Sequence, residues 1–195
     1  MGRSYLEDLF ETMHPYVDGL KFAGGSYALM PRDRVKEIIE LAHGYGAYVS
    51  TGGWIEHVLR CGAKAVENYL AEAKDLGFDV IELSTGFISL PESDLRGSSA
   101  EWRIGAEGKT GTWHSIWGGR SDLCCRTAAE GTRDAQWVIE RARACLDAGA
   151  HIIMIESERI TENVGEWRMD VAARIVSALG IEKIMFGAAG PPVFE

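Results

Sequence analysis

The 195-residue sequence has no long hydrophobic run, no signal-peptide pattern and no stripe of basic residues. Its longest apolar runs, such as that from Ile152 to Ile155, are too short to cross a bilayer, and Met1 leads directly into an amphipathic stretch. With a net charge of -9 and no clustered lysine or arginine, the chain lacks the positive charge that nucleic-acid binding requires. We therefore expect a cytoplasmic protein with neither membrane nor nucleic-acid partners.

Cysteine is also scarce and shows no ligand-like spacing. The four cysteines form no C-x-x-C motif and have no partnering histidines, so neither a disulfide framework nor a zinc site is predicted. No G-x-G-x-x-G motif follows a predicted strand, which weakens the case for a dinucleotide-binding fold. The composition, with 46% hydrophobic and 25% charged residues, is typical of a globular chain with a sizeable core, and we expect one domain over residues 1–195.

A repeat of helix, glycine and short strand sets the fold. In four stretches the apolar residues recur with the period of an α-helix, the stretch ends near a glycine, and an apolar run follows. The glycines are Gly46, Gly77, Gly149 and Gly180. Glycine is favoured there because a left-handed residue after a helix carries no Cβ penalty. Two of the intervals between these glycines are 31 residues, the length of a βα unit, which predicts a parallel α/β fold, either a barrel or a doubly wound sheet.

Several segments, in the same order along the chain, resemble strand ends of the phosphosulfolactate synthase family. They are residues 21–26 (KFAGGS), 48–54 (YVSTGGW), 77–84 (GFDVIELS), 148–156 and 183–186. The resemblance is strongest to the eukaryotic branch, which includes the plant heat-stress-associated proteins. It implies a (β/α)8 TIM barrel, and the archaeal members of the family add sulfite to phosphoenolpyruvate with Mg2+ in coenzyme M biosynthesis.

Three charged residues lie at predicted strand ends, where a barrel of this type carries its active site. We expect Lys21, Glu82 and Glu156 to be catalytic, with Glu82 and Glu156 also holding Mg2+ and Lys21 contacting the phosphate or carboxylate of the substrate. A carboxylate-held cation and an ammonium group would stabilise the enediolate that sulfite addition creates. The alternatives are solvated strand-end carboxylates, and a snorkelling or salt-bridged lysine.

A second set of strand-end residues could bind the substrate phosphate. The set is Gly24, Gly25, Ser50, Thr51, Gly52, Gly53 and Ser84. Paired glycines let backbone N–H groups approach a phosphate, although ordinary tight turns explain them equally well. His57 follows one of these pairs and could be a general acid or base, but we expect it to pack at the barrel rim.

The helical and strand periodicity is lost over residues 96–128, where a helix and the fifth strand are due. A polar insertion or a functional lid would account for such a segment. Read one nucleotide later, however, the codons for residues 105–119 permit the string G-L-K-A-K-P-E-L-G-I-Q-F-G-A, which resembles the fifth strand of the family. Our hypothesis is that a misplaced splice junction or a frameshift replaced this segment. The transcript across it provides the test.

Together these observations predict an incomplete barrel in which strands one and eight are absent and strand five is disturbed. Unpaired sheet edges recruit other chains, so a homo-oligomer is expected. Gly187 stands where the resemblance implies a glutamate. We expect a phosphosulfolactate synthase-like lyase that takes phosphoenolpyruvate and sulfite, with impaired activity. The alternative is a non-catalytic, stress-associated barrel that acts through protein interactions.

Overall fold

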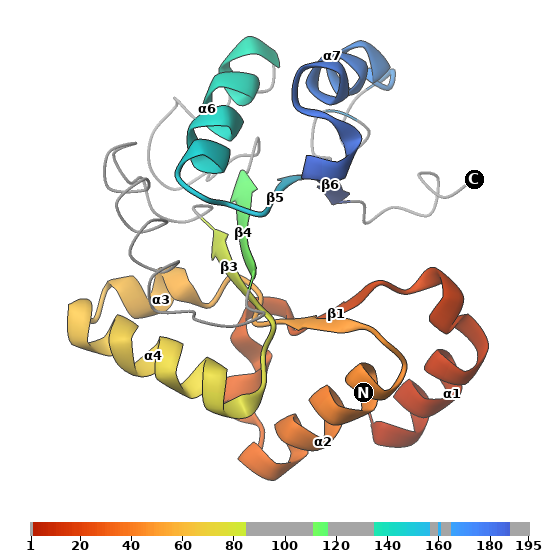
Figure 1. The fold of residues 1–195 in the computed structure, drawn as a ribbon, viewed down its shortest axis with the longest axis vertical. Coiled ribbons are helices and arrows are strands. Elements are labelled where there is room, and N and C mark those ends of the chain that lie inside the picture. Colours follow the sequence, from red (N-terminus) through yellow and green to blue (C-terminus); the bar gives the residue numbers. More distant parts are fainter. Residues whose placement is uncertain (1, 85–110, 117–134, 157–159, 161–164, 188–195) are drawn as a thin grey trace. The chain divides into compact units, whose positions relative to one another are not determined.

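The computed structural model of the protein describes residues 2–84, 111–116, 135–156, 160 and 165–187, which fall into two compact units (Figure 1). Within this part of the chain, the first unit holds residues 2–82 and Gly111, and the second holds Leu83, Ser84 and the described residues from Thr112 onward, so β3 and β4 each have residues in both units. Both units are α/β. None of the helices in the described ranges combines the length and apolar character needed to traverse a bilayer.

The first unit alternates helices with three short parallel strands. Its elements are α1 (Arg3–Met13), η1 (His14–Tyr16), β1 (Gly19–Lys21), η2 (Ala23–Leu29), α2 (Arg32–Gly44), β2 (Tyr48–Ser50), α3 (Ile55–Leu59), α4 (Ala63–Leu76) and β3 (Val80–Ser84). Strand β2 lies between β1 and β3, with Lys21 opposite Ser50 and Ser50 opposite Val80. Parallel pairing along the chain is the arrangement that the glycine-terminated repeat predicts.

The helix ends in this unit follow the predicted glycine pattern. Gly77 caps α4 in the left-handed conformation with φ 96°, and its N–H donates to the carbonyl oxygens of Ala73 and Lys74. Gly46, after α2, also has a positive φ of 81°. Both turns bring the chain directly into a buried strand, so these two predictions are confirmed.

The core of the first unit is built from the apolar faces of its helices and from β2 and β3. Its buried side chains include Leu6, Phe10, Val35, Ile39, Ala42, Val49, Ala73, Leu76, Phe78, Val80 and Ile81. Phe10 of α1 stacks on Tyr45 after α2, with ring centroids 5.3 Å apart. A second aromatic group joins Phe22, Tyr27 and Phe78, which lie edge to face at 5.0–6.3 Å. These contacts fix the segment that follows β1 against Phe78, two residues before β3 begins.

The second unit repeats the same plan. Its elements are β4 (Gly111–Ile116), α6 (Ala135–Asp147), β5 (Ile152–Glu156), α7 (Met169–Leu179), η3 (Ile181–Lys183) and β6 (Ile184–Gly187). Strand β5 is parallel to β4 and to β6, with Ile153 opposite both His114 and Ile184. Gly149 and Gly180 have positive φ angles of 105° and 85°, as predicted for the residues that follow these two helices.

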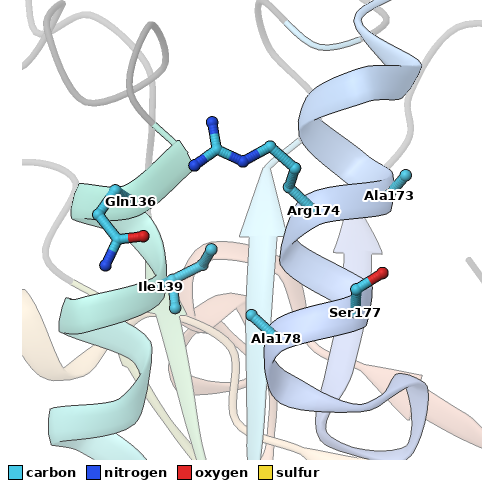
Figure 2. A pocket seen from close by; sticks show the side chains of 6 residues that line it. All are labelled: Gln136, Ile139, Ala173, Arg174, Ser177 and Ala178. Carbon is cyan, nitrogen blue, oxygen red and sulfur yellow. The ribbon is translucent and has the colours of Figure 1, made fainter.

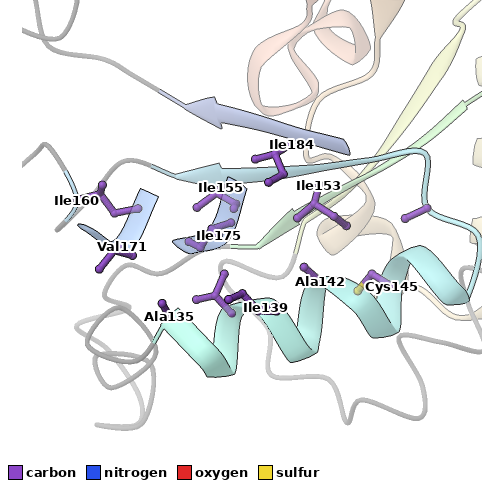
Figure 3. Close-up of a cluster of buried hydrophobic side chains, with 12 residues drawn as sticks. Ala135, Ile139, Ala142, Cys145, Ile153, Ile155, Ile160, Val171, Ile175 and Ile184 are labelled. Atoms are coloured by element: carbon purple, nitrogen blue, oxygen red, sulfur yellow. The ribbon is translucent and has the colours of Figure 1, made fainter. Parts of the chain in front are cut away.

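One hydrophobic cluster holds the second unit together (Figure 3). Ile139 and Ala142 of α6, Ile153 of β5, and Val171 and Ile175 of α7 are all buried in it. The neighbouring strand residues Met154 and Ile155 are buried as well. Burial of three consecutive strand residues means that both faces of β5 are covered, as expected for an apolar strand in a parallel sheet.

The structure differs from one expectation about the middle of the chain. A six-residue strand, β4, lies inside the segment 96–128 and pairs with β5 at four positions, whereas the sequence predicts a disturbed strand there. The paired positions run from Trp113 to Ile116, so the backbone of this stretch has regular strand geometry. The rest of the segment lies outside the described residues, and its proposed origin in a shifted reading frame stays a hypothesis.

Candidate active site at the ends of the first three strands

An ion pair between two predicted site residues joins the end of β1 to the middle of β3, because β3 continues for two residues beyond Glu82. The Nζ atom of Lys21 lies 2.9 Å from Oε1 and 2.8 Å from Oε2 of Glu82. The Glu82 carboxylate is buried, whereas the Lys21 side chain is 38% exposed. A single ammonium group thus stands over a buried carboxylate with one side open to solvent. The predicted alternative of a salt-bridged lysine at position 21 is confirmed.

Strand register explains how residues so far apart in sequence meet. Lys21 is opposite Ser50 on β2, and Ser50 is opposite Val80 on β3. Side chains alternate between the faces of a strand, so Glu82, two residues after Val80, points to the same face as Lys21 and Ser50. The ion pair therefore spans the end of β2 on one face of the sheet.

Ser50 and Thr51 are buried, and protein atoms hold their hydroxyl groups. Both residues are 0% exposed. The Ser50 Oγ accepts a hydrogen bond from the N–H of Gly52 at 3.2 Å. The Thr51 Oγ1 donates to the Gly52 carbonyl at 3.2 Å and accepts from the Tyr69 hydroxyl at 2.9 Å and from the N–H of Glu82 at 3.4 Å. In this arrangement the two hydroxyls organise the turn after β2.

The predicted glycines form tight turns at the ends of β1 and β2. Gly24, Gly25 and Gly52 have positive φ angles of 57°, 71° and 66°. A Cβ atom on Gly52 would lie 2.0 Å from the Phe22 carbonyl oxygen, and one on Gly25 would lie 2.3 Å from the Trp54 ring. At these positions only glycine fits, because both the backbone angle and the close approach exclude a side chain. Gly53 continues the turn after Gly52.

Buried tyrosine hydroxyls lie behind these turns. Burial raises the pKa of Tyr69 to about 12, although its hydrogen bond to Thr51 acts in the opposite direction. Burial also raises the pKa of Tyr27 far above its usual range, and the neighbouring Tyr69 adds to that effect. Both hydroxyls therefore stay protonated at neutral pH. Tyr69 is accordingly a permanent hydrogen-bond donor to Thr51.

His57 stacks on Trp54. Their ring centroids are 4.5 Å apart with an interplanar angle of 24°. The His57 side chain is exposed, in the middle of the short helix α3. The predicted place of this histidine at a barrel rim stays a prediction.

The remaining predicted site residues lie in strands whose side chains are not described at these positions. Ser84 is the last residue of β3, and Glu156 is the last residue of β5. In the register of β5 and β6, Glu156 is opposite Gly187. The structure therefore confirms their strand-end positions, and their roles stay predictions.

The described residues do not by themselves provide a magnesium site. Among them, no group of three histidine, cysteine or acidic side chains could hold a metal ion. Glu82, the predicted ligand, already has the Lys21 ammonium against both of its oxygens. A divalent cation on the same carboxylate would meet the repulsion of that ammonium. We therefore derive no catalytic step through a metal at Glu82.

A pocket of about 420 Å3 lies between α6 and α7 of the second unit (Figure 2). It is lined by Gln136, Ile139, Ala173, Arg174, Ser177 and Ala178. None of the predicted site residues lines it. Three of these six residues, Ala173, Ser177 and Ala178, are small, and the pocket is an open surface groove between two helices.

Sequence reasoning missed Tyr69 as a member of this site. Tyr69 is buried on α4 together with Ala73 and Leu76, which follow it by four and seven residues. These spacings place all three on one helical face. A tyrosine on the buried face of an amphipathic helix must find a partner for its hydroxyl, and that requirement is a usable signal.

Comparison with known proteins identifies the family. The sequence profile of the (2R)-phospho-3-sulfolactate synthase (ComA) family matches residues 1–195. The chain belongs to the phosphosulfolactate synthase family.

The fold also resembles those of solved structures. One is a Burkholderia cenocepacia protein described as a lyase/mutase, with a TM-score of 0.57, 16% identity, and coverage of 94% of this chain and 65% of that one. Another is oxaloacetate acetylhydrolase, with a TM-score of 0.52, 17% identity, and coverage of 90% and 61%. These likenesses show an α/β fold of the TIM-barrel type.

Two relatives of the phosphosulfolactate synthase family place the chain more closely. It is 36% identical over 207 residues to the protein HEAT-STRESS-ASSOCIATED 32 of Arabidopsis thaliana, covering 100% of this chain and 72% of that protein. It is 34% identical over 90 residues to phosphosulfolactate synthase of Methanothermobacter thermautotrophicus, covering 46% of this chain and 34% of that protein. The predicted family and its eukaryotic branch are thus supported.

Proposed function

We propose that this member of the family is a lyase that adds sulfite to phosphoenolpyruvate to give (2R)-phospho-3-sulfolactate. The observation that carries the proposal is the Lys21–Glu82 pair, which presents a partly exposed ammonium at the ends of parallel strands. Ends of this kind carry the active site in enzymes of this fold type. Family membership supports the same reaction class.

The proposed reaction needs one stabilised anion and one proton. The sulfur lone pair of sulfite forms a bond to the methylene carbon of phosphoenolpyruvate, and the double-bond electrons move onto the carboxylate to give an enediolate. A proton delivered to the adjacent carbon completes the product, and the phosphate ester is kept. Lys21 would stabilise the enediolate charge, because a preorganised ammonium acts where negative charge develops. Glu82 would hold that ammonium in place.

The glycine turns support binding of the substrate phosphate. At Gly24 a Cβ atom would meet nothing within 4 Å, so an anion could approach the backbone at the end of β1. At Gly25 and Gly52 that space is taken by the Trp54 ring and the Phe22 carbonyl, so phosphate contacts there and at Gly53 stay a proposal. We propose that Ser50 and Thr51 shape this cradle through their buried hydroxyls. The Mg2+ ion that the family resemblance implies also stays a proposal, as do contributions from Ser84 and Glu156.

Gly187 supports the proposal that this chain is less active than a family member with a glutamate at this position. It ends β6 opposite Glu156, so β6 offers no carboxylate at this position. We propose impaired activity on this basis. The same observation favours the second candidate function, in which the barrel acts through protein interactions without catalysis. Cytoplasmic location and self-association stay predictions.

Loss of sulfite in the presence of phosphoenolpyruvate and Mg2+ tests the proposal directly. Phosphate release is uninformative, because the ester survives. We expect slow sulfite consumption by the wild-type chain, its loss in Lys21→Met, and no change in Glu67→Gln. Glu67 forms a surface ion pair with Lys64 and is the matched control. Gly187→Glu should raise the rate. No sulfite loss by either the wild type or Gly187→Glu would favour the non-catalytic function.

A further inference from the structure

We infer that Tyr69 is a positioning residue that sets the Lys21–Glu82 pair from the opposite face of the sheet, through the hydroxyl of Thr51. This inference rests on the proposed function in taking that pair as the reactive centre. Tyr69 comes from α4, whereas Lys21 and Glu82 come from β1 and β3.

The connection runs through one fully buried oxygen atom. The Thr51 Oγ1 accepts from the Tyr69 hydroxyl at 2.9 Å and from the Glu82 N–H at 3.4 Å, and donates to the Gly52 carbonyl at 3.2 Å. Three partners in three directions fix the rotamer of a β-branched side chain. The contact with Glu82 is the longest of the three, so it is the most sensitive to rotation of the hydroxyl.

The backbone of Glu82 links Thr51 to the ion pair, because its N–H donates to Thr51 while its carboxylate accepts from Lys21. Thr51 follows Ser50, whose side chain shares a face with the ion pair, so Thr51 points to the other face, toward Tyr69. The Glu82 N–H lies in the plane between the two faces. Its position determines where the carboxylate sits beneath the Lys21 ammonium.

The chemistry of Tyr69 suits this role. Tyr69 is 5% exposed, so its hydroxyl is largely shielded from bulk solvent. The raised pKa of about 12, caused by burial, keeps the hydroxyl a donor throughout the working pH range. Loss of the hydroxyl would leave Thr51 with one partner fewer in a buried site, where every polar group needs a partner.

Two readouts separate positioning from catalysis. In protein with isotope-labelled lysine, the Lys21 ammonium signal, assigned with Lys21→Arg, reports the ion pair by its slow proton exchange. We expect Tyr69→Phe to speed that exchange at least about threefold. We also expect it to lower kcat for sulfite addition by roughly tenfold, with KM nearly unchanged, since small misplacements at a reacting centre have large effects on rate.

Matched variants control for simple loss of stability. Tyr48→Phe removes another partly buried hydroxyl, at the start of β2, and should leave both readouts unchanged. Thr51→Val should reproduce the effect of Tyr69→Phe, and Thr51→Ser should retain the wild-type signal. In the double variant, Tyr69→Phe should add nothing to Thr51→Val, as expected for two groups that act through one contact.

An unchanged Lys21 signal in Tyr69→Phe, or in Thr51→Val if the first variant does not fold, would overturn the inference. Equal effects of Tyr48→Phe and Tyr69→Phe would overturn it too, because they would indicate a general loss of packing. A wild-type protein that consumes no sulfite, but whose Lys21 signal still responds to Tyr69→Phe, would reject the proposed reaction and support the positioning role.

Discussion

Gly52 approaches Phe22 so closely that a Cβ atom on it would lie 2.0 Å from the Phe22 carbonyl oxygen. The two residues belong to the turns after β2 and β1, and the N–H of Phe22 also donates to the Ser50 carbonyl at 3.0 Å. Backbone contacts alone therefore hold the ends of the two strands together. They also fix the position of Lys21, the residue before Phe22, next to Glu82.

Replacement of Gly52 by alanine should destabilise the protein by about 3 kcal/mol or more, because a strained backbone angle and a steric overlap add together. Gly46→Ala is the matched control. Its φ of 81° is also positive, but a Cβ there meets nothing within 4 Å. The control should cost about 1–2 kcal/mol. Urea unfolding measures both, and equal losses would contradict the close approach.

The Lys21–Glu82 pair should respond unequally to loss of either partner. Lys21→Met leaves the buried Glu82 carboxylate without its ammonium and should cost about 3 kcal/mol. Glu82→Gln leaves the ammonium in contact with solvent and should cost roughly 1 kcal/mol. The exposed Glu67→Gln control should change stability by less than about 0.5 kcal/mol. A larger loss in Glu82→Gln than in Lys21→Met, by denaturant unfolding, would argue against a buried carboxylate.

Stability should fall at alkaline pH because of buried tyrosines. The pKa of Tyr69 is raised from 10.0 to about 12 by burial, so the native state holds a proton that the unfolded state releases. The stabilising effect is complete below pH 10 and is lost as the pH rises toward 12. Tyr48, with a pKa raised to about 12, acts in the same window. Denaturant unfolding across this range should show a smaller decline in Tyr69→Phe. An identical decline would exclude a contribution from Tyr69.

Truncation of Ile175 should strongly lower the stability of the second unit. It is 0% exposed in the cluster of α6, β5 and α7, and its truncation to alanine should cost about 2–5 kcal/mol by leaving a cavity. Ile181, in η3, is 64% exposed, and Ile181→Ala should change stability by less than about 0.5 kcal/mol. Thermal unfolding of the two variants provides the comparison, and equal shifts in Tm would contradict the packing of this cluster.

Much of the fold could be predicted because the signals that end its helices and begin its strands are local in sequence. Glycine after a helix and an apolar strand directly after the glycine are short-range signals, and they are found at Gly46, Gly77, Gly149 and Gly180. Strand β4 could not be predicted in the same way. Its sequence, Gly111–Ile116, lacks the continuous apolar run, so only pairing with β5 identifies it as a strand.

Individual residues of the site could be predicted from the sequence, but the contacts between them could not. Lys21 and Glu82 were expected at strand ends, but their contact depends on register across β2, which is a long-range property. Ser50 and Thr51 are adjacent polar residues, and a sequence does not show that their hydroxyls turn inward to Gly52 and Tyr69. The contact with Tyr69 is set by packing of α4, whereas the contact with Gly52 forms within the turn.

Ser50 faces Lys21 and Thr51 faces Tyr69, so the end of β2 is compatible with one register of the strands and not with registers shifted by one residue. A slip of a single residue would exchange the two faces, bringing the threonine toward the ammonium and the serine toward the tyrosine. The hydroxyls would then lose their partners, and the carboxylate would no longer lie beneath the lysine. A misaligned chain would thus lack the Lys21–Glu82 ion pair even if it remained compact, so this pair also serves as a check on correct assembly.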